Sequence, residues 1–302
     1  MKHNDALIEK TATLKQQRGA VILAHNYQLP EVQDIADFVG DSLELSRKAA
    51  ETDAQVIVFC GVHFMAETAK ILSPDKTVLI PDPHAGCPMA DMINAEQLRD
   101  FKKQHPGLPV VAYVNTSAEV KAESDICCTS ANAVRVVESM EANEILFVPD
   151  KSLGAYVASK TNKKIITYCG FCPTHHRILA QDVINTKRER PDALVVAHPE
   201  CIMEVIKLAD AVESTSGMIR YVKASDTREF IVCTERGILH RLKKDNPEKV
   251  FYNPSPLNIC PNMKKITLEK ILWSLEDMQY RIELPQEMIE KARAAIEGMI
   301  AI

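Results

Sequence analysis

Glycine is scarce in this sequence: only 10 of its 302 residues are glycine, and it contains neither a G-x-G-x-x-G nor a Walker A sequence. Phosphate-binding loops for dinucleotides and for ATP depend on those glycine-rich sequences, so both are disfavoured. Long apolar runs are also lacking, since the longest, such as 20–24, have the length of a strand and are far too short to span a membrane. The charged segment 1–18 is not followed by the apolar core of a signal peptide. We therefore expect a cytosolic protein that does not associate with a membrane.

Positive charge is not in excess either. The chain has 36 Lys and Arg against 41 Asp and Glu, a formal net charge of −5, with both signs interspersed. That distribution offers no basic stripe for nucleic acid and no polybasic patch for a membrane surface. With 46% hydrophobic and 25% charged residues the composition is that of a globular protein, and the length predicts two or three compact units.

Short β-rich runs alternate with stretches of helical spacing along the whole chain. This alternation predicts an α/β fold, with parallel sheets covered by helices. The nine predicted strands are 20–24, 56–59, 77–80, 110–114, 145–148, 164–168, 193–197, 230–233 and 249–252. Helices are predicted at 31–50, 64–72, 95–104, 132–140 and 199–208, and in 267–302 with a break at Pro285.

Three of the nine cysteines are followed directly by proline, and they divide the chain into similar parts. Cys87, Cys172 and Cys260 are 85 and 88 residues apart, and each follows a predicted strand. A near-regular period of this kind is typical of internal repeats. We therefore predict three similar three-layer α/β domains related by a pseudo-threefold axis. The expected domains are 1–90, 91–175 and 176–265, with C-terminal helices in 266–302 packing on the core.

The Cys-Pro pairs favour metal binding by these three cysteines. Proline is preferred at the first position of a helix, which places each cysteine near a helix N-terminus, where the thiolate is stabilised. Iron–sulfur ligands are often followed by proline. Three converging thiolates would hold a [4Fe-4S] cluster at the centre of the repeats and leave one iron open as a Lewis acid.

Two other interpretations of the cysteines stay open at this point. The three could be unrelated turn cysteines, or zinc could bind at Cys169 and Cys172 with two nearby histidines, although a lone C-x-x-C pair is a weak zinc signal. Those histidines are His175 and His176. Cysteines without an expected role are taken as core thiols, since cytosolic proteins rarely form disulfides. They include Cys127, Cys128, Cys169, Cys201 and Cys233.

Each predicted repeat also pairs a polar strand end with hydroxyls at a helix start. Ligands of α/β proteins bind at the carboxyl ends of parallel strands, and hydroxyls and free N–H groups at helix starts suit phosphate and carboxylate. The alternative is that the hydroxyl residues Ser42, Ser130 and Thr215 are ordinary N-caps. The polar strand ends are His25-Asn26-Tyr27, Tyr113-Val114-Asn115 and His198-Pro199-Glu200.

These segments, in this order, closely resemble the motifs of bacterial and archaeal quinolinate synthases. The other matching motifs are Gly40-Asp41-Ser42, Thr129-Ser130-Ala131-Asn132, Gly170-Phe171-Cys172-Pro173, Ser214-Thr215-Ser216-Gly217-Met218 and Cys260-Pro261-Asn262-Met263-Lys264. The resemblance implies three α/β domains around a central [4Fe-4S] cluster. It also implies an enzyme of de novo NAD biosynthesis that condenses iminosuccinate with dihydroxyacetone phosphate to give quinolinate, phosphate and water. An L-aspartate oxidase or dehydrogenase that supplies iminosuccinate is the partner it suggests.

The resemblance further implies individual roles. Cys87, Cys172 and Cys260 correspond to the cluster ligands, and Tyr27, His198 and Glu200 to the acid–base residues. The expected substrate contacts are His25, Ser42, Tyr113, Val114, Asn115, Ser130, His198, Pro199, Glu200 and Thr215. One departure concerns a C-x-x-C-x-x-C sequence that some members carry at the last ligand and that is associated with a disulfide switch. Here Pro254 and Leu257 occupy the other two positions, so we expect no such switch.

Two alternative functions remain. The radical aminocarboxypropyl transferases of diphthamide synthesis are similar in having three repeats, one cysteine in each, and one cluster, but they use S-adenosylmethionine and a protein substrate. The strand-end motifs of this chain suit a small dianionic substrate better. A non-enzymatic iron–sulfur sensor or carrier would need a surface for DNA or for a partner, and the sequence indicates neither.

Overall fold

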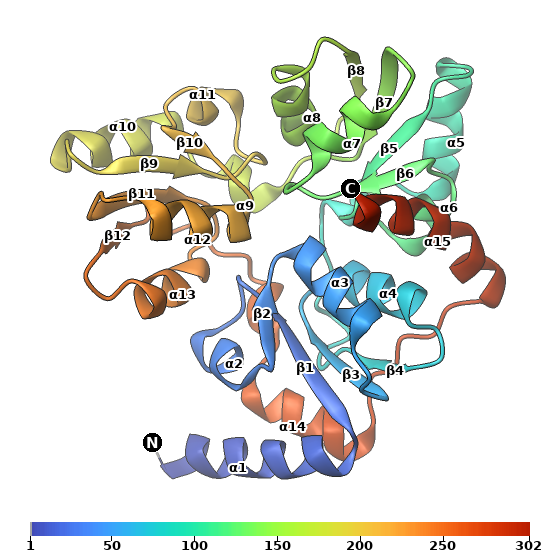
Figure 1. The fold of residues 1–302 in the computed structure, drawn as a ribbon, viewed down its shortest axis with the longest axis vertical. Coiled ribbons are helices and arrows are strands. Elements are labelled where there is room, and N and C mark those ends of the chain that lie inside the picture. The colour runs from blue at the N-terminus through green and yellow to red at the C-terminus, as the bar shows by residue number, and fades with distance from the viewer. Residues whose placement is uncertain (1) are drawn as a thin grey trace.

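The computed structural model describes residues 2–302, and its strands form three four-stranded parallel sheets (Figure 1). The first sheet contains β1 (Ala20–His25), β2 (Phe38–Gly40), β3 (Val56–Cys60) and β4 (Thr77–Leu79). The second contains β5 (Val110–Tyr113), β6 (Ile126–Cys128), β7 (Glu144–Val148) and β8 (Lys164–Thr167). The third contains β9 (Leu194–Ala197), β10 (Ala211–Val212), β11 (Glu229–Cys233) and β12 (Val250–Tyr252). The predicted α/β class with three similar units is confirmed.

The three sheets share one strand order. They read β2-β1-β3-β4, β6-β5-β7-β8 and β10-β9-β11-β12, and every pairing is parallel. Figure 1 shows the sheets arranged around a common centre. The same order in three consecutive stretches of chain supports the triplication that the cysteine spacing predicts.

All nine predicted strands are present, but three further strands were missed. β2, β6 and β10 are only 3, 3 and 2 residues long, and each lies at the edge of its sheet. Strands this short show too little periodicity to be recognised from sequence. β2 also divides the helix predicted at 31–50 into α2 (Pro30–Ile35) and α3 (Ser42–Glu51). The prediction of three strands per repeat is therefore wrong, and the number is four.

The remaining helices connect the strands. The helix predicted at 199–208 is shortened to α11 (Met203–Ile206), because residues 198–201 form a turn in which the Cys201 N–H donates to the His198 carbonyl. The others that precede the C-terminal segment are α1 (Lys2–Gln17), α4 (His63–Leu72), η1 (Ala90–Met92), α5 (Ala95–Gln104), α6 (Ala118–Ala122), α7 (Ala133–Ser139), α8 (Lys151–Ala158), α9 (Pro173–His176), α10 (Ala180–Glu189), α12 (Thr215–Ala224), α13 (Ile238–Asp245) and η2 (Met263–Lys265).

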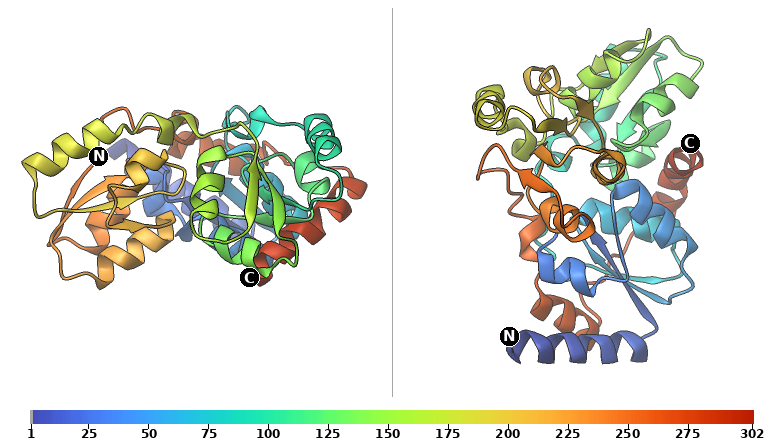
Figure 2. Two further views of the ribbon diagram at one scale, coloured as in Figure 1. Left: turned by 90° about the horizontal axis from the view of Figure 1, so that it is seen from above. Right: turned by 60° about the vertical axis from the view of Figure 1, so that its left-hand side comes forward.

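Two C-terminal helices pack back on the repeats. α15 (Gln286–Ala301) lies against α4 of the first repeat and against α6 and β6 of the second, and it buries Ile289 and Ile296 in the core that these repeats share. α14 (Leu268–Asp277) instead packs against α1, away from the centre (Figures 1 and 2). The first two repeats are therefore joined by a helix that belongs to neither.

The third sheet is buried on both faces. Val196 and Val232 face the core shared with the other repeats, whereas Val195 and Ile231 face a separate small core. This alternation follows the two-residue period of a strand. A sheet covered on both faces is the three-layer arrangement that was predicted. Within residues 2–302, no helix combines the length and the apolar character that crossing a membrane requires.

Candidate active site

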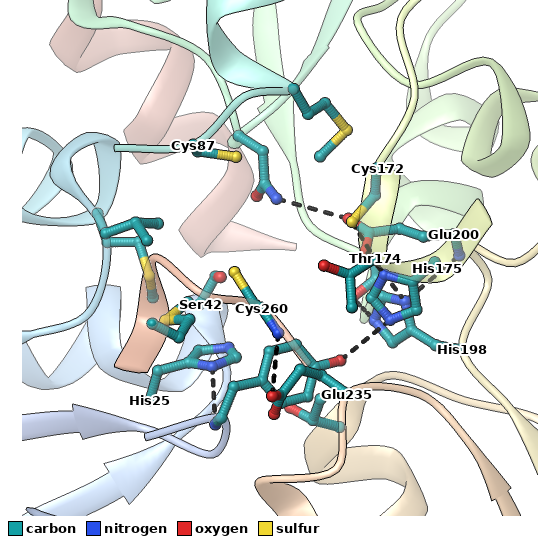
Figure 3. A pocket seen from close by; sticks show the side chains of 18 of the residues that line it. His25, Ser42, Cys87, Cys172, Thr174, His175, His198, Glu200, Glu235 and Cys260 are labelled. Atoms are coloured by element: carbon teal, nitrogen blue, oxygen red, sulfur yellow. Dashed lines mark hydrogen bonds and ion pairs between the residues drawn. The ribbon is translucent and has the colours of Figure 1, made fainter. Parts of the chain in front are cut away.

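The three Cys-Pro cysteines meet at one cavity at the centre of the molecule. Each lies in the loop that follows the fourth strand of its sheet, with Cys87 after β4, Cys172 after β8 and Cys260 after β12. Figure 3 shows their side chains directed toward the same space. The cavity is lined by residues from all three repeats, including Ser42, Ser130 and Thr215.

The turn after each cysteine directs backbone N–H groups at the sulfur. Cys172 is the N-cap of α9 and Pro173 is its first residue, as predicted, whereas η1 and η2 begin three residues after the other two cysteines. Burial raises the pKa of the Cys87 thiol to about 12, against the opposing effect of the Ala90 and Met89 N–H groups. Burial thus raises the pKa of the thiol by more than the N–H groups of the helix start lower it. The thiolate expected from the sequence therefore depends on a bound metal.

The six other cysteines lie outside this cavity. Cys169 is exposed, so its expected place in the core is wrong. His176 hydrogen-bonds to Ser152 Oγ at 2.8 Å and does not line the cavity. The C-x-x-C pair therefore contributes Cys172 alone, which disfavours the zinc interpretation. The buried cysteines are Cys60, Cys127, Cys128, Cys201 and Cys233, in agreement with core thiols.

The thiols that line the cavity fit a cluster with three cysteine ligands. All three line the cavity, and backbone N–H groups surround their sulfur atoms, as is typical of iron–sulfur sites. A second set of possible ligand atoms overlaps with them. One atom each of Cys172, His175 and Glu200 lie within 4.8 Å of one another, close enough for a single metal ion. The described residues thus offer two alternative metal sites that share Cys172.

Glu200 lies opposite the cysteines and is held by two histidines. It is only 3% exposed, and its Oε2 lies 2.6 Å from His175 Nδ1 and 3.5 Å from His198 Nδ1. Burial raises the pKa of Glu200, but His175 and then His198 oppose burial and lower the pKa to about 2. A general base usually has a pKa near neutrality, whereas Glu200 is ionised well below it, and its principal partner is His175 rather than His198.

Tyr27 is connected to the same histidine through a threonine. The Tyr27 hydroxyl lies 2.5 Å from Thr234 Oγ1, and Thr234 Oγ1 lies 2.8 Å from His175 Nε2. Burial and the charge of Glu200 raise the pKa of Tyr27 well above its usual value. Tyr27 is therefore a neutral phenol that can donate a proton, and the contacts form a continuous path from Tyr27 to Glu200.

The histidines at the first-strand ends are neutral. His25 is the last residue of β1 and His198 directly follows β9, so the equivalent strands of two repeats carry them. Burial lowers the pKa of each to about 3, against the opposing charge of Glu200. In each ring Nδ1 accepts from a backbone N–H group, that of Tyr27 at 3.1 Å for His25 and that of Glu200 at 3.3 Å for His198, so Nε2 carries the N–H that can donate.

Ser42, Ser130 and Thr215 all line the cavity, and none of them is an N-cap. The caps are Asp41 for α3, Asn132 for α7 and Ser214 for α12, so the N-cap alternative is wrong. Ser130 Oγ lies 3.2 Å from His198 Nε2, and Thr215 Oγ1 accepts a hydrogen bond of 2.9 Å from Asn26. The three hydroxyls are thus available to a ligand from three sides.

Two more predicted residues line the cavity and two do not. The Tyr113 hydroxyl hydrogen-bonds to Glu200, and Asn115 Nδ2 lies 3.5 Å from Glu200 Oε1. The buried Asn115 Oδ1 has no hydrogen-bond partner within the described chain, which suits it to accept from a ligand. In contrast, Val114 and Pro199 do not line the cavity. Their neighbours face the cavity because successive residues of an extended chain point in opposite directions.

Several residues of the site were not assigned a role from sequence. His175 was considered only as a zinc ligand, although its position three residues after Cys172 places it one helical turn away. Thr234 and Glu235 follow β11, the third strand of its sheet, whereas the predicted polar motifs all lie at the ends of the first strands β1, β5 and β9. Glu235 is fully buried, accepts from the Cys260 N–H at 3.1 Å and pairs with Lys264 at 3.0 Å.

Comparison with known proteins agrees with this geometry. Residues 9–301 match the family model described as Quinolinate synthetase A protein. The chain is 58% identical over 300 residues to the quinolinate synthase of Dehalococcoides mccartyi (strain CBDB1), covering 99% of each chain. It is 57% identical to quinolinate synthase 1 of Methanosarcina acetivorans, covering 98% of this chain and 97% of the relative. It is 56% identical to the quinolinate synthase of Thermodesulfovibrio yellowstonii, covering 98% of both.

A cavity that brings buried ionisable side chains together with three cysteines, at the meeting point of three α/β domains, is typical of an enzyme. The chain belongs to the quinolinate synthase family. The resemblance based on the motifs is therefore confirmed over nearly the whole length. Membership in this family also removes the diphthamide-type transferase and the sensor or carrier as alternatives.

Proposed function

We propose that this enzyme condenses iminosuccinate with dihydroxyacetone phosphate to give quinolinate, phosphate and two waters. The observation that carries the proposal is the convergence of all three repeats on one cavity. That cavity is lined by three cysteines, by three carboxyl side chains that include the ionised Glu200, and by neutral hydroxyl and imidazole donors. Both proposed substrates are small dianions, and such donors suit carboxylate and phosphate groups.

Cys87, Cys172 and Cys260 would hold a [4Fe-4S] cluster in this proposal. When bound, the cluster would supply an iron without a protein ligand, which acts as a Lewis acid. The protein contributes the backbone N–H groups around the thiols and the buried Glu235–Lys264 pair that fixes the turn at Cys260.

The proton transfers fall to the residues on the opposite side of the cavity. Glu200 is ionised and buried, so it can remove a proton from the condensing carbon or nitrogen. Tyr27 is a neutral phenol and can give a proton to a departing oxygen. Thr234 and His175 lie between them at hydrogen-bonding distances, so a proton lost by Tyr27 can be replaced along that path.

Substrate binding is assigned to groups that carry no competing charge. His25 and His198 are neutral donors, and Ser42, Ser130 and Thr215 present hydroxyls to the cavity. The free Asn115 Oδ1 can accept from the imine N–H of iminosuccinate. These contacts orient the two substrates and keep water out of the site.

The test is anaerobic reconstitution with iron and sulfide, followed by incubation with both substrates and chromatography for quinolinate. The expected result is quinolinate and phosphate in equal amounts, with none formed when either substrate is omitted. A protein that contains the cluster but forms no quinolinate would contradict the proposal. Cleavage of S-adenosylmethionine by the same preparation would instead support radical chemistry.

We further propose that the enzyme works in the cytoplasm beside the source of iminosuccinate. Iminosuccinate is an imine and hydrolyses in water, so an L-aspartate oxidase or dehydrogenase must produce it nearby. Quinolinate yield from aspartate in a coupled mixture, compared with yield from the two enzymes separated by a membrane permeable to small molecules, tests this arrangement. Equal yields would show that proximity is unnecessary.

A further inference from the structure

The N-termini of two helices from different repeats are bonded to each other beside the cavity. α3 belongs to the first repeat and α12 to the third, and both are 10 residues long. Their first residues, Ser42 and Thr215, both line the cavity. α3 and α12 converge near the centre in Figures 1 and 2. The position of one hydroxyl relative to the other therefore depends on how these two helix starts are joined.

Asp41 makes the connection with both oxygens of its side chain. It is the N-cap of α3, and its Oδ1 accepts from the N–H groups of Leu43 and Glu44 at 3.1 and 3.0 Å. Its Oδ2 accepts a hydrogen bond of 3.1 Å from the Ser214 hydroxyl. Ser214 is itself the N-cap of α12, where its Oγ accepts from the Gly217 N–H at 3.2 Å. Two helix caps 173 residues apart are thus hydrogen-bonded to each other.

Ser216 strengthens the same junction from the other side. The Asp41 N–H donates to Ser216 Oγ at 3.2 Å, and the Ser216 hydroxyl donates to Glu44. Glu44 closes the capping box of α3 by accepting from the Asp41 N–H at 3.2 Å.

The Thr215 hydroxyl beside this junction is free to donate. Thr215 Oγ1 already accepts from the Asn26 amide, so its own hydrogen can point at a ligand. Arg241 holds the other end of that amide at 3.0 Å, which fixes the direction in which Asn26 donates. Asp41 also lines the cavity, and N–H and O–H donors of the protein hydrogen-bond to both of its carboxylate oxygens.

We propose that Asp41 is a positioning residue that joins α3 to α12, so that Ser42 and Thr215 bind one anionic group of a substrate together. In this inference the identity of the substrate rests on the proposed function, whereas the junction between α3 and α12 does not. The caps occupy the N–H groups of Leu43, Glu44 and Gly217, so the hydroxyls of Ser42 and Thr215 are the donors, and they can bind one anion together only if their spacing is fixed. Asp41 sets that spacing across the boundary between two repeats.

The test compares Asp41→Ala and Ser214→Ala with Asp41→Asn. The alanine variants remove the link from either side, whereas asparagine keeps an acceptor for the α3 N–H groups and can donate to Ser214 Oγ. We expect the alanine variants to raise the KM of at least one substrate roughly tenfold with kcat nearly unchanged, since a misplaced binding group weakens binding. Asp41→Asn should restore KM to within about threefold of wild type, and the Asp41→Ala/Ser214→Ala double variant should be no worse than either single one.

Asn94→Ala is the matched control. Asn94 caps α5, which is also 10 residues long and has a capping box, but it lies outside the cavity. Its loss should lower the melting temperature without changing KM. If Asp41→Ala and Ser214→Ala behave like this control, the inference is wrong.

Failure of the proposed function would be recognised separately, because the wild-type enzyme would then form no quinolinate. In that case the affinity for inorganic phosphate, measured by titration calorimetry on wild type and on Asp41→Ala, decides the inference. Weaker binding by the variant supports it, and equal behaviour of the two proteins overturns it.

Discussion

The two sides of the cavity are built in different ways. The cysteine side, formed by Cys87, Cys172 and Cys260, comes from three equivalent loops after the fourth strands, and its thiols are surrounded mainly by backbone N–H groups. The proposed acid–base side, which consists of Tyr27, His175, His198, Glu200 and Thr234, is held by contacts between side chains, most of them far apart in the sequence. The cysteine side repeats a local motif three times, whereas the acid–base side exists only once the repeats have assembled.

This difference predicts that the two sides fail separately. A change on the cysteine side should remove the metal and all activity with it. A change on the acid–base side should leave the metal in place and slow only the chemical step. Substitutions on each side of the cavity test this contrast.

Loss of Cys87 or Cys260 should have the most severe consequence. Cys87→Ala or Cys260→Ala removes one of three protein ligands, so we expect iron binding and quinolinate formation both to be abolished. Iron per chain after anaerobic reconstitution is the measurement. Cys233→Ala is the control, since Cys233 is buried away from the cavity, and its iron content should be nearly unchanged. Full iron content in Cys87→Ala would contradict metal binding by the cysteine side.

Glu200→Gln should leave iron in place while lowering kcat by roughly 10²–10⁴, the usual contribution of a general base. Glutamine preserves the size of the side chain and removes the carboxylate that can accept the proton. Glu204→Gln is a suitable control, because Glu204 is exposed on α11. Turnover of Glu200→Gln within about tenfold of wild type would mean that the base is another group.

Tyr27→Phe should lower kcat toward the smaller end of the same range, roughly 10², because the ring stays in place and only the phenolic proton is lost. The pH profile gives a second readout. With the phenol removed, water must supply the proton. The part of the decline of kcat at high pH that comes from ionisation of the phenol should therefore disappear. Tyr221→Phe, on α12, changes a tyrosine outside the cavity and should have neither effect.

Ser130→Ala should have the smallest effect, a rise in KM of roughly threefold to tenfold, which is the scale of one lost hydrogen bond. Kinetics and thermal unfolding should be measured on the same protein. Ser117→Ala is the contrasting control, because Ser117 is a true N-cap, with its Oγ accepting from the Val120 N–H of α6. That variant should lose stability and keep its KM, and the reverse pattern would assign Ser130 a structural role.

The cysteine side could be predicted from sequence because it repeats one local motif. A Cys-Pro pair after a strand is a local pattern, and its threefold repetition at near-equal spacing is visible without a structure. The strand ends that carry His25, Tyr113 and His198 were likewise predicted, because position at a strand end is local information. The edge strands β2, β6 and β10 were not predicted, because strands of two or three residues are too short to show a hydrophobic periodicity.

The acid–base side could be predicted only in part, because its pairs are distant in sequence. Glu200 was expected beside His198, its neighbour along the chain, but it lies closer to His175. Thr234 received no role, since nothing near it in sequence indicates that Tyr27 would lie within hydrogen-bonding distance. These groups come together only when all three repeats have folded against one another. No local sequence pattern predicts the contacts between them.

The most direct test of the separation between the two sides uses residues that share one neighbour. His175 Nδ1 lies 3.1 Å from Cys172 Sγ and 2.6 Å from Glu200 Oε2, and the three residues could together hold a single metal ion. Iron per chain should be measured for Cys172→Ala and Glu200→Gln, reconstituted anaerobically side by side. We predict that Cys172→Ala binds almost no iron and that Glu200→Gln binds as much as wild type. If Glu200→Gln also loses its iron, the metal is held by the Cys172, His175 and Glu200 set, and the division of the cavity into two sides is wrong.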